Sequence, residues 1–324
     1  MRGGPTMMSA ARLRRGEETI TMLFLFQYPE TSGLDGDLLD AGPVAEVAAA
    51  AEAAGWGGLS FTEHPAPSAR WLANGGHQSL DPFVALACAA GATQRLRLLT
   101  YLSVAPYRNP LVLAKTASSL DKVSNGRFIL GIGTGYLKSE FFAVGVDFEH
   151  RNQRFDEALD VLPLHWSGEP FSYQGSDFDA RDVIGRPRPV QDPIPIWIGG
   201  NSKLSKRRVA QRADGWMPML GPPTLSQTAR TPGIETAEDV AAAVEEIKVM
   251  RADAGRGDEP LDVMFSYQDR SIEQDPTADA DRHRERLAQL EALGITTVVF
   301  STHSTSLEGT KDFLAAFGET YLGA

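Results

Sequence analysis

Short apolar runs alternate with longer amphipathic or alanine-rich segments from residue 22 to the C-terminal end. Runs of this length are typical of buried strands, and the longer segments, several opened by Asp-Pro or Asn-Pro, are typical of helices. The pattern predicts strands at residues 22–26, 58–63, 96–104, 128–133, 194–198, 215–219, 261–267 and 296–301. It predicts a helix after each of them, at residues 43–54, 81–90, 109–125, 152–166, 202–213, 236–254, 278–293 and 307–321.

This alternation favours one fold. Strands that alternate with helices form right-handed crossovers and a parallel sheet, and eight such units close a (β/α)8 TIM-like barrel. A doubly wound open sheet is the alternative, and it would place a glycine-rich turn after the first strand. Residues 27–33 there read QYPETSG, and the glycine-rich stretch follows the fourth strand instead. We therefore expect one barrel domain over residues 21–324, with an insertion at residues 167–192.

Residues 1–20 form a basic leader, which we expect to be disordered and outside the fold. The leader lacks the apolar stretch of a secretory signal, and no window reaches the roughly 18 apolar residues of a membrane span. We expect a cytoplasmic protein that does not bind membranes. The net charge of −11 argues against nucleic acid as a partner. The single Cys88 excludes an intramolecular disulfide and a cysteine-based zinc site.

The stretch FILGIGTGYLKSE at residues 128–140 carries the strongest chemical signal. Its Gly133, Thr134 and Gly135 follow an apolar strand, where glycines would let main chain approach a planar or anionic ligand. A tight strand-to-helix turn is the alternative explanation. In a barrel the chemistry lies at the C-terminal strand ends. The other predicted ends carry Glu63 with His64, Ser103 with Val104, and the group Gly199, Gly200 and Asn201.

These strand ends lack a set of ligands suited to a metal, and they lack a nucleophile with an obvious base. Small, polar and glycine residues predominate, which suits a flat cofactor that brings its own reactivity. The segments that carry this character are TEHPAP (62–67), YRNPLVLAKTASSLDKVSNGRFILGIGTGYLKSEF (107–141), HRNQRFDEAL (150–159), PIPIWIGGNS (193–202) and ADGWMP (213–218). With these segments the chain resembles the luciferase-like superfamily of flavin- and deazaflavin-dependent oxidoreductases, within it the probable F420-dependent oxidoreductases.

The resemblance implies a role for each strand end. His64 would lie near the reactive face of the bound ring, with Glu63 orienting it or only forming a salt bridge. A non-prolyl cis peptide at Ser103 and Val104 would support the back of the ring. Gly133, Thr134 and Gly135 would contact the ring or its side chain, and Gly199, Gly200 and Asn201 the ribityl and phosphate part. A hydrogen-bonded rim histidine without catalysis is the alternative for His64.

One departure from the family pattern concerns the substrate. Sugar-phosphate dehydrogenases of this superfamily have a catalytic acid where Tyr136 stands here, which argues against sugar-phosphate oxidation. Trp71, Tyr136 and Phe141 are expected to line a pocket for an apolar or aromatic substrate. The resemblance implies hydride transfer from reduced F420 to a small organic molecule, or alternatively monooxygenation with reduced FMN and O2. A non-catalytic flavin-binding protein is the alternative of another class, and a homodimer is expected.

Overall fold

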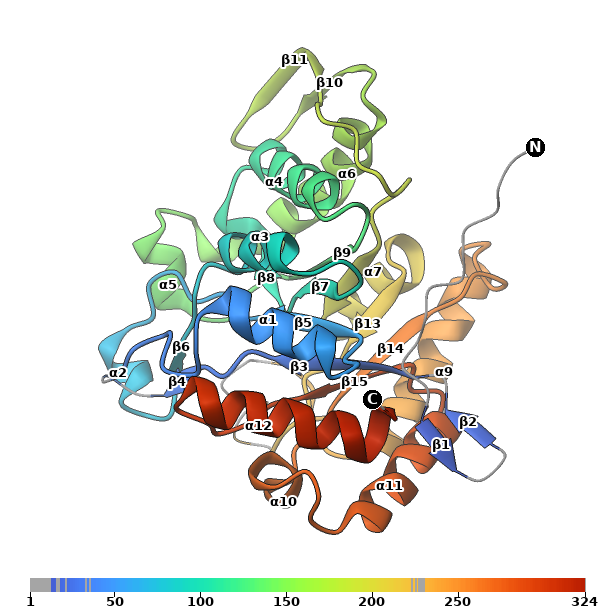
Figure 1. The fold of residues 1–324 in the computed structure, drawn as a ribbon. Helices are drawn as coiled ribbons and strands as arrows, with labels where there is room; N and C mark the ends of the chain where they lie inside the picture. Colours follow the sequence, from blue (N-terminus) through green and yellow to red (C-terminus); the bar gives the residue numbers. More distant parts are fainter. Residues whose placement is uncertain are drawn as a thin grey trace, which may run out of the picture.

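The computed structural model describes residues 13–15, 18–20, 22–32, 34, 36–222, 224, 226 and 231–323. Its centre is a closed barrel of parallel strands, in the order β12-β13-β14-β15-β3-β5-β7-β9 with β9 also paired to β12 (Figure 1). The barrel strands are β3 (Leu23–Gln27), β5 (Gly58–Phe61), β7 (Arg97–Thr100), β9 (Phe128–Gly133), β12 (Ile196–Gly199), β13 (Gly215–Met217), β14 (Asp262–Ser266) and β15 (Thr297–Phe300). The predicted fold is confirmed.

The strand register brings all C-terminal strand ends to one rim. Leu25 of β3 pairs with Gly58 of β5, and Ile198 of β12 pairs with Ile132 of β9 across the point of closure. A two-residue strand, β8 (Ser103–Val104), adds to β9 just beyond the barrel proper. The chemistry of the chain is therefore to be sought at this rim.

The main helices surround the barrel, and local sequence fixes where they begin. The Asp81 carboxylate accepts the amides of Phe83 and Val84, both at 3.0 Å, with Pro82 in the first turn. Such caps satisfy amides that have no partner inside the helix. The helices that follow the eight strands are α1 (Val44–Ala53), α3 (Pro82–Ala92), α4 (Pro110–Val123), α6 (Arg151–Ser167), α7 (Lys203–Arg212), α9 (Ala237–Asp253), α11 (Ala280–Ala292) and α12 (Leu307–Phe317).

Strand side chains point alternately into two separate cores. One core fills the space between strands and helices, and Phe24, Phe26 and Trp56 lie in it. The other fills the barrel interior below the rim and consists of Leu25, Leu99, Ile129, Trp197, Met217, Met264 and Val299. Complete burial of one such side chain stabilises the fold by about 1.5–3 kcal/mol. The interior core therefore fills the barrel below the rim.

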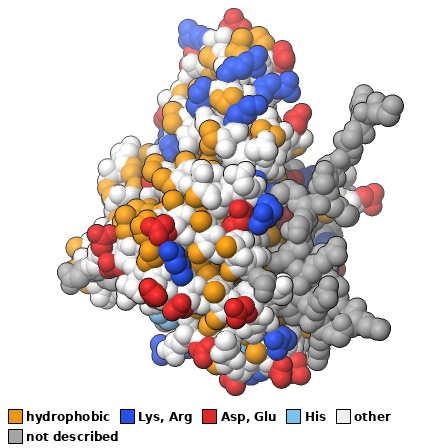
Figure 2. Space-filling view, viewed as in Figure 1, with side chains coloured by type: hydrophobic (Ala, Val, Ile, Leu, Met, Phe, Trp, Pro, Cys, Tyr) orange, Lys and Arg blue, Asp and Glu red, His pale blue; other side chains and the backbone are white. Residues whose placement is uncertain are grey.

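Shorter elements interrupt the alternation. The predicted insertion at residues 167–192 contains a hairpin of β10 (Pro170–Gln174) and β11 (Asp179–Ile184), which stands out beyond α4 and α6 at the top of Figure 1. Lys and Arg side chains gather over this end of the molecule in Figure 2. The remaining elements are α2 (Ala69–Leu72), α5 (Lys138–Ala143), α10 (Arg270–Gln274), β4 (Thr31–Ser32), β6 (His77–Gln78), η1 (Ala105–Tyr107), η2 (Phe148–His150) and η3 (Gly318–Leu322).

Of the leader that was expected to be disordered, residues 1–12, 16 and 17 lie outside the described residues. The described remainder forms two short antiparallel strands, β1 (Leu13–Arg15) and β2 (Glu18–Ile20). Within the part of the chain that the structure describes, none of the helices has the length and apolar composition that a membrane crossing requires.

Candidate functional site

A cavity of about 570 Å³ opens at the C-terminal rim of the barrel. Its size lies in the range of sites for small molecules and cofactors. Strand ends and the loops that follow them form its wall, and most of the residues predicted for the site lie in it. Predicted residues that line it are Glu63, His64, Val104, Gly133, Thr134, Gly135, Tyr136, Gly199 and Gly200.

His64 lies in the cavity wall with one side of its ring engaged. Its Nδ1 lies 3.2 Å from Glu140 Oε2, and the two side chains are 10% and 1% exposed. The same Glu140 oxygen accepts the hydroxyl of Tyr107 at 3.0 Å, and burial beside Glu140 raises the pKa of that phenol. Among the described residues, the other ring nitrogen of His64 has no hydrogen-bond partner. Glu140 therefore orients the ring and leaves Nε2 for a ligand.

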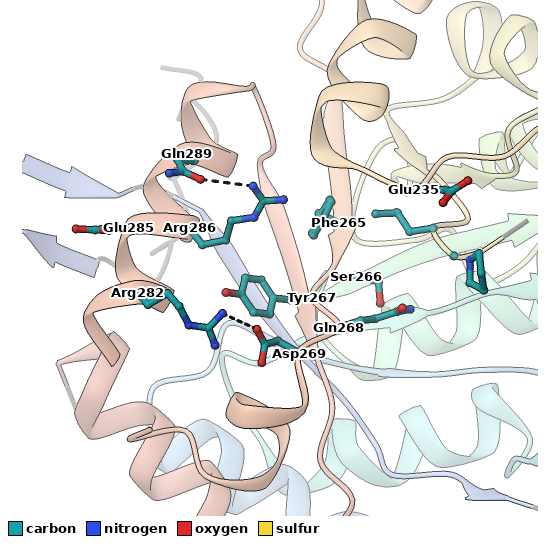
Figure 3. A pocket seen from close by; sticks show the side chains of 13 residues that line it. Glu235, Phe265, Ser266, Tyr267, Gln268, Asp269, Arg282, Glu285, Arg286 and Gln289 are labelled. Atoms are coloured by element: carbon teal, nitrogen blue, oxygen red, sulfur yellow. Dashed lines mark hydrogen bonds and ion pairs between the residues drawn. The ribbon is translucent and has the colours of Figure 1, made fainter. Parts of the chain in front are cut away.

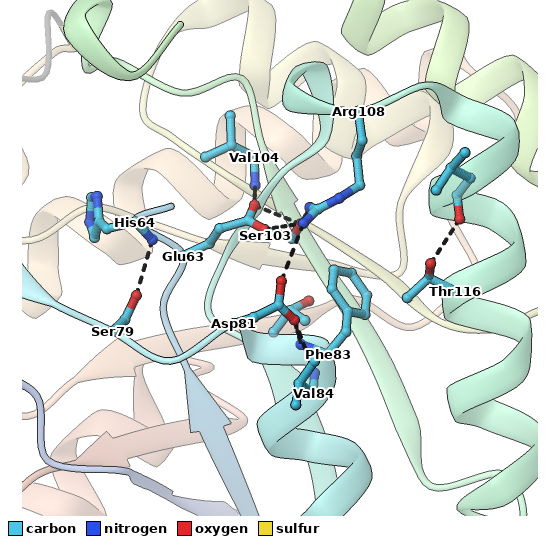
Figure 4. Close-up of polar contacts among 12 residues, drawn as sticks. Glu63, His64, Ser79, Asp81, Phe83, Val84, Ser103, Val104, Arg108 and Thr116 are labelled. Atoms are coloured by element: carbon cyan, nitrogen blue, oxygen red, sulfur yellow. Dashed lines mark hydrogen bonds and ion pairs between the residues drawn. The ribbon is translucent and has the colours of Figure 1, made fainter. Parts of the chain in front are cut away.

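Glu63 does not contact the His64 ring, although the two residues are adjacent. Its Oε2 accepts the Val104 amide at 2.6 Å and the Ser103 hydroxyl at 3.0 Å. Its Oε1 forms an ion pair with Arg108 Nη2 at 2.6 Å, without the alignment of a hydrogen bond. Figure 4 shows this carboxylate directed away from His64. Of the two roles expected for Glu63, the salt bridge is the one present, and Glu140 takes the orienting position.

The end of the third barrel strand differs from the prediction. The non-prolyl cis peptide joins Tyr101 and Leu102, and Ser103 with Val104 follow it as β8. The expected position was wrong by two residues because the barrel strand ends at Thr100 and the chain then pairs anew with β9, Ser103 opposite Ile132. Ser103 is fully buried and bonds to Glu63 and Arg108, whereas Val104 faces the cavity.

Leu102 explains two of the glycines at the rim. A Cβ on Gly199 would lie 2.2 Å from Leu102 Cδ2, and a Cβ on Gly133 would lie 2.7 Å from Leu102 Cδ1. Leu102 itself lines the cavity. The glycines therefore make room for a leucine side chain between β9 and β12, and this side chain, with Val104, gives the floor an apolar surface. The interpretation that these glycines expose main chain to a ring is incomplete.

The other predicted cofactor contacts divide into two kinds. Gly135 and Gly200 have positive φ angles, +75° and +106°, which glycine adopts at little cost. Both line the cavity beside Thr134. Asn201 is 2% exposed, and its amide group is occupied by Met219 and by the carbonyl of Pro232. Asn201 therefore holds the loop after β13 and does not face the cavity.

The aromatic residues expected in the pocket also divide. Tyr136 lines the cavity, and burial raises the pKa of its hydroxyl to about 12, so that it stays protonated at neutral pH. Trp71 packs on the His64 ring at 4.6 Å between centroids and does not line the cavity. Phe141 is fully buried between Tyr107 and Phe148, and its assignment to the pocket was wrong. On the helix α5, its side chain faces the small core behind the wall.

Three titratable residues of the site were missed from the sequence. Glu140 lies in the first turn of α5, and its spacing of five residues from Gly135 was the only available signal. Glu30 lies in the loop after β3 and His77 in the two-residue strand β6, and their carboxylate and ring lie 3.1 Å apart. Burial raises the pKa of Glu30 to about 7, and burial with the neighbouring His64 lowers the pKa of His77 to about 4. The loop after β3 and the pairing of the short strands β4 and β6 place them, so the pattern of the barrel strands could not predict them.

The part of the cavity wall formed by α6 and the start of α7 is polar. Ser202 caps α7 by accepting the Ser205 amide at 3.0 Å, and both serines line the cavity with Arg151 and Asn152. The first turn of a helix favours negative charge, because its amides point toward the ligand. These residues could hold the phosphate of a cofactor.

A second cavity of about 540 Å³ adjoins the first (Figure 3). The two share Leu220, Ser266 and Gln268 as a common wall. Two of its charged groups, Arg282 and Asp269, pair at 2.9 Å, and Arg286 donates to Gln289 Oε1 at 3.4 Å. We assign it no ligand.

Comparisons with known proteins agree with this geometry. The family model of the luciferase-like monooxygenases matches residues 20–268. An uncharacterised protein of Mycobacterium tuberculosis is 35% identical over 148 residues, 46% of this chain, and the match spans 51% of that relative's length. The F420-dependent glucose-6-phosphate dehydrogenase of Tsukamurella paurometabola is 25% identical over 228 residues, which cover 68% of this chain and 64% of that enzyme.

Solved structures share the fold at low identity. An F420-dependent secondary alcohol dehydrogenase in complex with an F420-acetone adduct superposes with a TM-score of 0.72 at 16% identity, covering 92% of this chain and 98% of the other. The oxygenating constituent of the FMN-bound 3,6-diketocamphane monooxygenase from Pseudomonas putida gives 0.70 at 15% identity, covering 93% and 98%. Because the family model matches well over half of the chain, this protein belongs to the luciferase-like monooxygenase family.

Proposed function

We propose that this protein is an oxidoreductase that binds reduced F420 at the rim cavity and transfers hydride to a small apolar or aromatic organic substrate. The observation that supports it most directly is the arrangement of the cavity: an apolar floor at Leu102 and Val104 and an imidazole in the wall with a nitrogen available to a ligand. Two of the sequence relatives are F420-dependent dehydrogenases, at 25% and 28% identity.

The residues present fit such a cofactor. The apolar floor suits the flat face of a ring system, and the polar end at Ser202, Ser205 and Arg151 suits its phosphate. The bound cofactor would supply the hydride. The chain itself would orient the ring and exchange protons with the substrate, for which His64 Nε2 is suitably placed. The protonated Tyr136 hydroxyl would donate a hydrogen bond to a substrate oxygen.

Fluorescence titration of the cofactor-free protein tests this proposal. Both F420 and FMN are fluorescent, so binding is followed as quenching or a change in anisotropy when each is added separately. We expect F420 to bind with at least tenfold higher affinity than FMN. Preferential binding of FMN, with O2 uptake on addition of reduced FMN, would favour the monooxygenase alternative. Binding without turnover of any carbonyl or alcohol substrate would favour a flavin-binding protein, and binding of neither cofactor would refute the proposal.

A homodimer stays a prediction. Sedimentation velocity of the full chain at micromolar concentration tests it, since the 35.1 kDa monomer and its dimer differ twofold in mass.

A further inference from the structure

A second imidazole lies in the cavity wall beside His64. His77 comes from β6, which pairs antiparallel with β4, and its side chain is 29% exposed. The rings of His77 and His64 meet edge to face at 4.7 Å between centroids, and Trp71 packs on both, 5.4 Å from the His77 ring. Both histidines line the cavity. The segment between β5 and α3 therefore brings two imidazoles to one wall.

A buried carboxylate holds the His77 ring. Glu30 Oε2 lies 3.1 Å from His77 Nε2, and the Glu30 side chain is 10% exposed. The other oxygen, Oε1, accepts the amide of Thr62 at 3.2 Å and contacts its hydroxyl. Gln27 Nε2 donates to Oε2 at 3.1 Å. With contacts to three neighbours, the carboxylate has a fixed position and fixes the ring in turn.

The two histidines share one pattern of contacts. Each has one ring nitrogen beside a carboxylate: His64 Nδ1 is hydrogen-bonded to Glu140, and His77 Nε2 lies at ion-pair distance from Glu30 Oε2 and 3.4 Å from the Thr62 hydroxyl. Within the described part of the chain, the second nitrogen of each ring, Nε2 of His64 and Nδ1 of His77, has no hydrogen-bond partner. An imidazole oriented by a carboxylate, with its other nitrogen open to a cavity, is the arrangement of a general acid or base.

We propose that His77 and Glu30 form a second proton-exchanging pair, which delivers a proton to a substrate oxygen while hydride reaches the adjacent carbon. This inference rests on the proposed function. The N–H bond at Nδ1 of His77 breaks as the O–H bond forms on the substrate, and the proton of the Glu30 carboxyl moves to Nε2. Glu30 ends as a carboxylate and His77 stays neutral, and reduced F420 supplies the two electrons with the hydride. In the oxidative direction every transfer runs backward.

The electrostatics of this wall support a proton held on Glu30. Burial raises the pKa of Glu30 to about 7, so its carboxyl is protonated in part of the molecules at neutral pH. Burial, with the charge that His64 can carry, lowers the pKa of His77 to about 4, so no imidazolium forms beside His64. Other groups facing the pair are the phenols of Tyr101 and Tyr136, both neutral because burial raises their pKa to about 12. Glu140 pairs with Nδ1 of His64 at 3.2 Å.

Infrared difference spectroscopy of the cofactor-free protein tests, without turnover, whether Glu30 holds the proton. Between pH 6 and pH 8 we expect the carbonyl band of one carboxylic acid to disappear with a midpoint near pH 7. Glu30→Gln removes this band. Glu273→Gln is the matched control. Glu273 Oε2 lies 3.0 Å from His303, whose side chain is 70% exposed, and neither residue lines the cavity. We expect the Glu273→Gln variant to keep the band. A band that persists in Glu30→Gln, or no titrating band above pH 6, overturns the proposal.

Turnover measurements test the role of the stored proton. We expect Glu30→Gln and His77→Asn each to lower kcat about 10²-fold with unchanged F420 affinity, and the double variant to lose no more than either. The limb of the kcat profile near pH 7 should vanish in Glu30→Gln and remain in His303→Gln. The proposal is overturned if the kcat losses of the two single variants multiply in the double variant. It is also overturned if the limb near pH 7 survives in Glu30→Gln. If the wild-type protein binds no F420, the proposed function fails, whereas the infrared result is unaffected and still decides whether Glu30 stores the proton.

Discussion

The two sides of the rim cavity are built on different principles. On one side, four titratable groups from the segments after β3, β5 and β9 form two imidazole-carboxylate pairs, His64 with Glu140 and His77 with Glu30. On the side of β9 and β12, glycines admit the Leu102 side chain. Charged and titratable groups define the first side, and the fit of the Leu102 side chain between glycines defines the second. The difference teaches that substitutions on the first side should alter proton chemistry, whereas substitutions on the second should alter stability and the fit of the ligand.

The largest effect is expected on the charged side, for His64→Asn. Loss of a general acid or base lowers turnover by about 10²–10⁴-fold. Asparagine keeps a polar group of similar reach, so F420 affinity should change less than threefold. Steady-state kinetics alongside fluorescence titration separates the two quantities. An unchanged kcat would show that His64 is a rim residue without a catalytic role.

Gly199→Ala probes the second side, where the Leu102 side chain fits between glycines. The added Cβ would meet Leu102 Cδ2 at 2.2 Å and push that side chain toward the cavity. Overpacking of this kind costs about 1–3 kcal/mol of unfolding free energy, and F420 binding should weaken with it. Denaturant unfolding and fluorescence titration measure the two effects.

Two further variants sharpen that result. Leu102→Ala in the Gly199→Ala background should restore part of the F420 affinity, because Leu102 is the side chain that the added Cβ displaces. Gly91→Ala on α3 is the matched control, since its Cβ would meet nothing within 4 Å. That control should raise the unfolding free energy by about 0.5–1 kcal/mol. Equal destabilisation in both glycine variants would refute the role assigned to Leu102.

The smallest effect expected is a change in how stability depends on pH. The folded pKa of Glu30 is raised from 4.5 to about 7, so its stabilising contribution is complete below pH 4.5 and is lost as pH rises toward 7. The folded pKa of His77 is lowered from 6.5 to about 4, so its contribution is complete above pH 6.5 and is lost as pH falls toward 4. Each slope is at most about 1.4 kcal/mol per pH unit, and the two oppose one another in the wild type.

Single variants separate these slopes. Relative to Glu30→Gln, the wild type should lose stability as pH rises from 4.5 to 7. Relative to His77→Asn, it should lose stability as pH falls from 6.5 to 4. Urea unfolding at half-unit intervals of pH checks both signs. Parallel curves for wild type and variants would mean that neither group has a shifted pKa.

The sequence predicted the barrel well because the apolar strand pattern and the helix caps are local. Asp81 and Asn109 begin helices through bonds to residues two or three positions later, and no distant contact is needed. The cis peptide was misplaced by two residues, because the end of β7 depends on pairing with β9, which the sequence of that strand does not reveal. Phe141 was misassigned because an aromatic residue beside a glycine stretch can face either side of the wall.

By itself the sequence determined the strand and helix order, the rim that carries the chemistry, and His64 with the glycines at strand ends. These follow from residue periodicity and from the rule that parallel strands all end on one face. Only the tertiary structure decided that Glu140 rather than Glu63 orients His64, that Leu102 occupies the space the glycines leave, and that Glu30 meets His77. The physical reason is that these contacts join loops and strands far apart in the chain, and their distances are fixed by packing, which no local pattern encodes.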